Sequence, residues 1–158
     1  MLLKGIVDED FSNYKKPSML LAFPYCSFKC GTLCQNLPIA KSKNIEYELK
    51  EILNQYYKNN ITTAIVCGGL EPLDSFDDLL ELLTEFRKIS NDDFVVYTGF
   101  DESEIYDKIA LLSYYENVII KFGRFIPNQE SHYDKILGVN LVSPNQYAKI
   151  IGEKNERL

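Results

Sequence analysis

Three cysteines stand close together in the first part of the chain, at Cys26, Cys30 and Cys34. Thiolates are the protein ligands of iron–sulfur clusters, and four of them usually saturate a cubane. Three cysteines on one loop would therefore leave one iron without a protein ligand. Because an open position on a metal is where a substrate can bind, this spacing suits a catalytic cluster. Gly31 and Thr32 are small enough for a loop that wraps around it.

The same cysteines could instead bind zinc or be unrelated thiols. Zinc takes four ligands in structural sites, and Cys67 or His132, the only histidine, could supply the fourth. The spacing of the cysteines alone does not decide between these alternatives. Cys67 ends an apolar segment, so we expect it to be a buried and inert thiol, as free cysteines often are.

Short apolar segments indicate the strands that would position this site. Four of them are expected to be buried strands, at Met19–Phe23, Thr62–Cys67, Phe94–Thr98 and Val118–Ile120. A further short strand is expected at 137–143, after a polar loop at 124–135, and a terminal turn or helix at 145–151. Most of these strands are separated by segments whose apolar residues recur at helical spacing, and the first three helices are expected at 45–56, 76–86 and 105–112.

Apolar strands that alternate with helices predict a parallel sheet with helices packed on it. We therefore expect an α/β fold, either an incomplete (β/α) barrel or a curved open sheet of about five mainly parallel strands with flanking helices. The length of 158 residues fits one domain over residues 1–158. Asp101 and Glu104 have the spacing of a capping box at the start of the third helix.

Glycine or cysteine follows each of the four expected central strands. In parallel sheets the ligand binds at the C-terminal ends of the strands. The sequence therefore predicts that the cysteine segment at 26–34, Gly68-Gly69, Thr98-Gly99 and Gly123 converge at one edge of the sheet. Lys121 interrupts a strand end that is otherwise apolar, which makes it a candidate contact for a ligand carboxylate.

Charge and hydropathy exclude some classes of partner. The net charge of −6 argues against binding to duplex nucleic acid, which requires a surplus of Lys and Arg. No apolar segment is long enough to span a bilayer. The first residues have no signal-peptide pattern, so we expect a cytoplasmic protein that binds neither nucleic acid nor membrane.

The order of the motifs resembles the radical-SAM superfamily. In that superfamily, three cysteines follow the first strand, and a Gly-Gly-Glu-Pro-like element follows the second, as Gly68-Gly69-Leu70-Glu71-Pro72 does here. Val96-Tyr97-Thr98-Gly99-Phe100, Gly123-Arg124-Phe125 and Ser143-Pro144-Asn145-Gln146 further resemble segments of the anaerobic (class III) ribonucleotide reductase activating enzymes. The resemblance covers most of residues 3–148, with the motifs in the expected order.

The resemblance implies a [4Fe-4S] cluster on Cys26, Cys30 and Cys34, with S-adenosylmethionine on the open iron. It also implies that the cofactor-binding residues are Gly68, Gly69, Glu71, Thr98 and Lys121, with no catalytic residue beyond the cluster. Reductive cleavage of S-adenosylmethionine would give a 5′-deoxyadenosyl radical. The implied partners are a glycyl-radical enzyme as protein substrate and a flavodoxin- or ferredoxin-type electron donor.

The sequence departs from the family pattern at several positions. The cysteine spacing is Cys-x3-Cys-x3-Cys where Cys-x3-Cys-x2-Cys is common, and Leu33 replaces an aromatic residue. Leu70 interrupts the Gly-Gly-Glu motif, and Lys121 stands in a segment where the family has Val-Asp-Gly. Two other functions stay open: a radical-SAM enzyme that modifies a peptide or small molecule, and a non-catalytic iron–sulfur electron-transfer protein.

Overall fold

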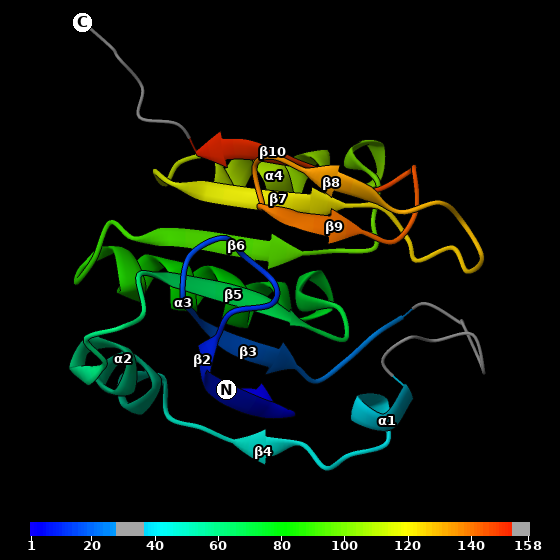
Figure 1. Cartoon of the computed structure of the whole chain (residues 1–158). Coiled ribbons are helices and arrows are strands. Elements are labelled where there is room, and N and C mark those ends of the chain that lie inside the picture. The colour runs from blue at the N-terminus through cyan, green and yellow to red at the C-terminus, as the bar shows by residue number, and fades with distance from the viewer. Residues whose placement is uncertain (28–36, 153–158) are drawn as a thin grey trace, which may run out of the picture.

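The computed structural model of the chain describes residues 1–27 and 37–152. Its main feature is a six-stranded sheet with the strand order β10-β7-β6-β5-β3-β2 (Figure 1). The four central strands are parallel to one another, and the edge strands β2 and β10 are antiparallel to their neighbours. The bounds of the six strands are Gly5–Asp10 (β2), Ser18–Phe23 (β3), Ala64–Gly69 (β5), Asp93–Tyr97 (β6), Val118–Phe122 (β7) and Tyr147–Gly152 (β10).

Two small antiparallel sheets accompany the main one. They pair β1 (Leu2–Leu3) with β4 (Ile45–Glu46), and β8 (His132–Asp134) with β9 (Val139–Leu141). The helices are α1 (Leu37–Ala40), α2 (Leu49–Lys58), α3 (Phe76–Arg87) and α4 (Tyr106–Leu112), with short 3-10 helices η2 (Pro72–Ser75) and η3 (Glu102–Glu104). Within the described residues, none of the helices has the length and apolar character that a bilayer-spanning helix needs.

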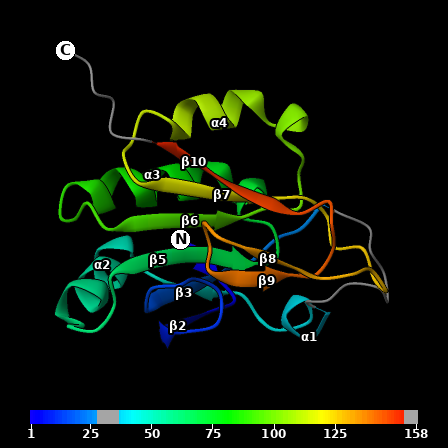
Figure 2. The same cartoon turned by 45° about the horizontal axis from the view of Figure 1, so that its top comes forward.

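The two faces of the sheet have different coverings. In Figure 1, α3 and α4 lie behind the sheet, whereas β8 and β9 lie in front of it; Figure 2 shows the same two layers from a tilted direction. Because successive side chains of a strand point to opposite faces, Ile65 and Cys67 of β5 join the larger core under the helices. Ala64 and Val66 face the other way and join a smaller core.

The smaller core connects the sheet to the β8–β9 hairpin. Leu137 and Leu141 of this part of the chain pack with Tyr14, which is buried and donates a hydrogen bond to Asp93 at 2.7 Å. The backbone N–H of Lys15 donates to the Leu137 carbonyl at 2.7 Å. The segment around Tyr14 and the hairpin thus form a second wall over the front face of the sheet.

The four expected central strands are confirmed as β3, β5, β6 and β7, and the three expected helices as α2, α3 and α4. The first helix begins at Leu49 and not at residue 45, because Ile45–Glu46 forms β4. The capping box is present too, with the Asp101 N–H donating to the Glu104 carboxylate at 3.0 Å and the reciprocal bond formed, but it caps η3 and not α4. The expected strand at 137–143 is shorter in the structure, where it is β9.

The sheet departs from the prediction in two respects. It is open in the described residues, as the open-sheet alternative required, but it has six strands where about five were expected, and a barrel is not seen. The segment at 145–151 is not a turn or helix, because most of it forms β10, which pairs with β7 from Tyr147↔Phe122 onward. This edge strand carries exposed Tyr147 and Lys149, so it lacks the continuous apolar pattern of the central strands. The loop expected at 124–135 also contains β8.

Candidate metal and ligand site

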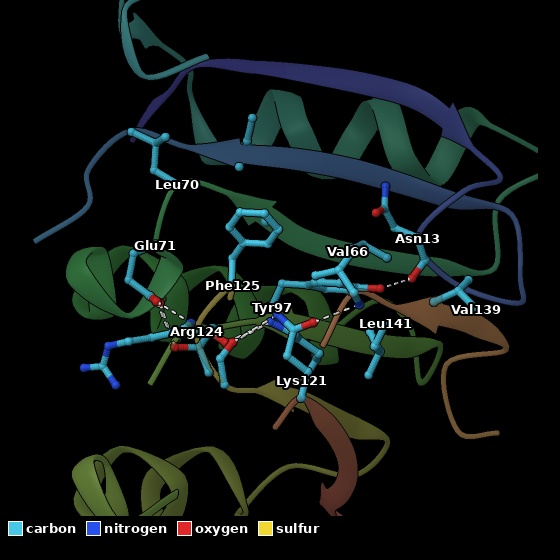
Figure 3. Close-up of a pocket in the computed structure, with 18 of the residues that line it drawn as sticks. Asn13, Val66, Leu70, Glu71, Tyr97, Lys121, Arg124, Phe125, Val139 and Leu141 are labelled. Atoms are coloured by element: carbon cyan, nitrogen blue, oxygen red, sulfur yellow. Dashed lines mark hydrogen bonds between the residues drawn. The ribbon is translucent and has the colours of Figure 1, made fainter. Parts of the chain in front are cut away.

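A cavity of about 430 Å³ opens on the front face of the sheet, at the C-terminal ends of the parallel strands. Its lining comes from β3, β5, β6 and β7 on one side and from the β9–β10 region on the other. Figure 3 shows that Glu71 and Leu70 lie toward one end of the cavity, and Asn13 and Val139 toward the other. An elongated cavity of this volume suits one small-molecule ligand.

The predicted convergence at this edge is confirmed for the described residues. Cys26, Gly68-Gly69, Thr98-Gly99 and Gly123 all line the cavity, although they follow four different strands. Lys121 lines it as well. Parallel strands bring their C-terminal ends together, so residues that are far apart in the sequence share one small volume.

Small residues lie side by side on two adjacent strands at the floor of the cavity, where Ala22 of β3 pairs in register with Gly68 of β5. On the next two strands the larger Tyr97 of β6 pairs with Lys121 of β7. Along β7, Ile120 and Phe122 belong to the core under the helices. The alternation of side chains therefore directs Lys121 to the front face, where it meets the cavity.

The two glycines at the end of β5 have different roles. Gly69 has a φ of +81°, and a Cβ there would lie 2.7 Å from the Ala22 Cα atom. Gly69 is therefore required by its left-handed conformation and by the close approach of β3. At Gly68, a Cβ would meet its nearest neighbour, the Leu20 Cδ1 atom, at 3.7 Å, which is an ordinary contact. Gly68 is thus not required by packing, and its missing side chain leaves space in the cavity.

Glu71 is a buried carboxylate, only 1 % exposed. One of its oxygens accepts a hydrogen bond from the Gly99 N–H at 2.8 Å, and the other accepts from the Leu73 N–H at 3.1 Å. The Thr98 hydroxyl lies 2.9 Å from both oxygens. Burial raises the pKa of Glu71, and the hydrogen bonds from Gly99, Leu73 and Thr98 oppose that rise. The carboxylate thus ties the loop after β5 to the turn after β6.

The Thr98 hydroxyl both donates and accepts a hydrogen bond within the protein. Its hydroxyl donates to Glu71 and accepts a hydrogen bond from the Phe100 N–H at 3.0 Å. The Glu71 and Thr98 side chains are therefore directed at each other and at backbone N–H groups. Gly99, whose backbone N–H donates to Glu71, is held in place by this pair and lines the cavity.

Lys121 places a buried ammonium group beside this pair. The side chain is 6 % exposed, and its Nζ donates to the carbonyls of Gly123 at 2.9 Å and Thr98 at 3.3 Å. Nζ also lies 5.8 Å from the centre of the Tyr97 ring. Burial lowers the pKa of Lys121 to about 8, and the nearby Glu71 charge opposes this shift. An ammonium has three N–H donors, so within residues 1–27 and 37–152 one remains for an anionic group in the cavity.

A known protein family covers most of the chain. A family model described as a 4Fe-4S single cluster domain matches residues 18–145. The chain belongs to this family. The match includes Cys26, Cys30 and Cys34, and it extends over the whole series of strand ends that line the cavity. No curated protein and no solved structure matches the chain.

As a member of the 4Fe-4S single cluster domain family, the protein is an iron–sulfur protein, which favours the cluster over the zinc alternative. Cys26 is exposed and lines the cavity. Cys30 and Cys34 lie outside the described residues. Among residues 1–27 and 37–152, no group of three His, Cys, Asp or Glu side chains could hold a metal ion. The positions that the structure describes thus offer one of the three expected ligands.

Cys67 and His132 could have completed a zinc site, but neither residue lines the cavity. Cys67 is fully buried under the helices, and burial raises the pKa of its thiol well above the usual value. Its predicted role as a buried thiol is confirmed. His132 lies in β8 and does not line the cavity.

Sequence reasoning missed several residues of this 4Fe-4S family member that line the cavity. Ser12 and Asn13 come from the segment before β3, and Asn140 comes from β9. Gln146, which also lines the cavity, belongs to the Ser143–Gln146 motif, but the motif alone gave it no role. Little in the sequence points to Ser12, Asn13 and Asn140, because polar residues in loops are common. Whether these residues reach the cavity depends on how the β8–β9 hairpin folds over the sheet.

Proposed function

We propose that this iron–sulfur protein is a radical-SAM enzyme that reductively cleaves S-adenosylmethionine. In this proposal Cys26, Cys30 and Cys34 hold a [4Fe-4S] cluster, and the cavity beside Cys26 holds S-adenosylmethionine. The observation that carries the proposal is that Cys26, Gly68 and Lys121 line one cavity of about 430 Å³. A thiolate ligand, space for a close approach to the backbone and a cation are thus combined in one site.

The residues present fit a ligand that ends in an amino-acid group. The Lys121 ammonium, held by two carbonyls, has a donor left for a carboxylate. The ammonium of the ligand requires acceptors, and the backbone at the end of β5 can approach it because Gly68 has no side chain. Glu71 and Thr98 would act on the ligand through the loops that their hydrogen bonds hold.

When bound, the cluster would supply one electron that cleaves the sulfonium carbon–sulfur bond, giving methionine and a 5′-deoxyadenosyl radical. The described residues would orient the ligand and exclude water around it. Apolar residues contribute to this exclusion: Leu20 and Val66 on the sheet face Leu141 across the cavity. A flavodoxin- or ferredoxin-type protein is proposed as the source of the electron.

We propose a protein as the substrate of the radical. A cavity of about 430 Å³ that holds S-adenosylmethionine leaves little volume for a second small molecule. The hydrogen donor would therefore reach the cavity from outside, as a segment of a glycyl-radical enzyme such as an anaerobic ribonucleotide reductase. Mixing the reduced protein, S-adenosylmethionine and that reductase should produce a glycyl radical signal in electron paramagnetic resonance. Its absence with an active cluster would favour a peptide or small-molecule substrate.

The ligand assignment is tested by spectroscopy of the reconstituted protein. S-adenosylmethionine should change the electron paramagnetic resonance spectrum of the reduced cluster, because it occupies the open iron. The Cys67→Ala variant is the matched control, since Cys67 is buried on the opposite face and should leave this change intact. An identical spectrum with and without S-adenosylmethionine would favour an electron-transfer protein instead.

A further inference from the structure

The turn at residues 143–146 is docked against the loop that follows β7. The Ser143 hydroxyl donates to the Asn145 side-chain oxygen at 2.5 Å, and the Asn145 amide donates to the Arg124 carbonyl at 2.9 Å. The Gln146 N–H closes the turn on the Ser143 carbonyl at 3.2 Å. Ser143 is fully buried and Gln146 is 2 % exposed. These polar side chains are therefore part of the contact with the loop after β7 and not of a solvated surface.

The contact leaves no space for a side chain on the facing loop. Gly123 has a φ of +103°, and a Cβ there would lie 2.9 Å from the Asn145 carbonyl oxygen and 3.2 Å from the Gln146 Cα atom. The turn thus approaches the Gly123 backbone as closely as a glycine permits. Because Gly123, Arg124 and Phe125 all line the cavity, the turn supports one wall of the ligand site from behind.

Gln146 shares an acceptor with Lys121. Its side-chain N–H donates to the Gly123 carbonyl at 3.3 Å, and the Lys121 Nζ donates to the same oxygen at 2.9 Å. A carbonyl oxygen has two lone pairs and can accept both hydrogen bonds. The side-chain oxygen of Gln146 accepts a hydrogen bond from the Val142 N–H at 3.1 Å. Gln146 therefore links Gly123 to Val142, and both of these residues line the cavity.

The same chain of hydrogen bonds continues across the sheet. Lys121 also donates to the Thr98 carbonyl, and the Thr98 hydroxyl donates to Glu71. The chain thus joins the loops after β5, β6 and β7 to the start of β10, and its side chains are all at most 6 % exposed. Hydrogen bonds within a buried network restrict the movement of the groups that they join.

We propose that Gln146 and the turn at 143–146 are positioning elements that hold Lys121 and the Gly123 wall in the arrangement that binds the ligand. Gln146 acts through the Gly123 carbonyl, and Asn145 acts through the Arg124 carbonyl. This inference deepens the proposed function and rests on it for the identity of the ligand. It assigns a physical role to the Ser-x-Asn-Gln motif, which no step of the proposed chemistry uses.

The first test follows the accessibility of Lys121 and requires no ligand. Gln146→Met keeps the length of the side chain and removes both hydrogen bonds, whereas Gln129→Met makes the same replacement at an exposed position and is the control. Brief treatment with acetic anhydride should modify Lys121 several-fold faster in Gln146→Met than in the wild type or the control, as measured by mass spectrometry. Equal rates in all three proteins would overturn the inference, whatever the protein binds.

A second variant tests the same inference in case Gln146→Met does not fold. Asn145 is only half-buried, and Asn145→Asp keeps the acceptor for Ser143 while it removes the donor to the Arg124 carbonyl. It should raise the rate of Lys121 modification in the same direction, by a smaller factor. A melting temperature close to that of the wild type would show that the fold is intact. No increase in this folded variant would contradict the role assigned to the turn.

The second test measures the affinity for S-adenosylmethionine by equilibrium dialysis with the reconstituted protein. Gln146→Met should weaken binding about tenfold, a change in binding free energy similar to the contribution of one hydrogen bond. In a Lys121→Met background the same change should have an effect below about twofold, because Gln146 acts through Lys121. Independent, multiplying effects would overturn the inference. If Lys121 modification rises as expected and the wild type binds no S-adenosylmethionine, the proposed function fails and the positioning role stands.

Discussion

The Thr98 hydroxyl lies 2.9 Å from each carboxylate oxygen of Glu71, so a single side-chain pair joins the loop after β5 to the turn after β6. Both residues are buried. A buried carboxylate is costly unless its oxygens are hydrogen-bonded. Here the Gly99 and Leu73 N–H groups complete the set of donors. The pair therefore fixes one edge of the cavity that Cys26 also lines.

Loss of the Thr98 hydroxyl should destabilise the protein. Thr98→Val removes the donor to Glu71 and leaves a buried carboxylate with less support, which should lower the free energy of unfolding by about 1–3 kcal/mol. Thr98→Ser retains the hydroxyl and is the matched control, with a loss below about 1 kcal/mol. Urea unfolding of the three proteins measures both values. If the Ser and Val variants lose the same amount, the hydroxyl does not stabilise this edge.

The two adjacent glycines should respond differently to alanine. Gly68→Ala places a methyl group in the cavity at ordinary contact distance from Leu20, so the fold should persist while affinity for S-adenosylmethionine falls about tenfold or more. Gly69→Ala requires a positive φ and a contact of 2.7 Å with the Ala22 Cα atom, so it should lower the melting temperature clearly. Calorimetry gives both quantities. The reverse pattern would mean that Gly69, not Gly68, leaves the space for the ligand.

Stability should depend on pH through Lys121. Burial lowers the pKa of this ammonium to about 8 from an ordinary value of 10.5. Between these two values the unfolded chain binds more protons than the folded one, so the free energy of unfolding rises with pH. The buried charge is therefore unfavourable below about pH 8, and this cost is relieved as the pH increases toward about 10.

The comparison of the wild type with Lys121→Met isolates this contribution, because both proteins share every other titrating group. From about pH 8 to pH 10 the wild type should gain stability relative to the variant, by at most about 1.4 kcal/mol for each pH unit. Urea unfolding at several pH values provides the measurement. A difference that is constant with pH would show that Lys121 keeps an ordinary pKa in the folded protein.

The three clustered cysteines should be required for the cluster, and Cys67 should not. Replacement of Cys26, Cys30 or Cys34 by Ala should abolish the intact cluster, whereas the wild type binds about four iron per chain. Cys67→Ala should retain the iron, because this thiol is fully buried under the helices and burial raises its pKa. Iron and sulfide analysis after anaerobic reconstitution decides the matter. Loss of iron only in Cys67→Ala would reassign the ligands.

How much of the site was predictable varied from residue to residue. Lys121 could be found because a charged residue within an apolar strand is conspicuous, and the two-residue period of a strand places it on one face. The hydrogen bonds between Glu71 and Thr98 could not, because these residues are far apart in sequence and the pairing depends on how the loops after β5 and β6 are placed.

The edges of the sheet were predicted less well than its centre. Buried parallel strands such as β5 and β6 carry continuous apolar segments, which are visible in the sequence. An edge strand needs only one apolar face, and β10 alternates buried Ala148 with exposed Tyr147 and Lys149. Short apolar segments of this kind do not distinguish a strand from a turn or helix. Gln146, which directly precedes β10 and lines the cavity, was therefore missing from the predicted site.

The most direct test of the central claim is the formation of 5′-deoxyadenosine. The reconstituted protein is reduced with dithionite under anaerobic conditions, S-adenosylmethionine is added, and the product is measured by mass spectrometry. We expect 5′-deoxyadenosine and methionine in equal amounts from the wild type and from Cys67→Ala, and none from Cys26→Ala. A wild-type protein that holds a full cluster under strong reduction and still forms no 5′-deoxyadenosine would contradict the proposal that this iron–sulfur protein is a radical-SAM enzyme.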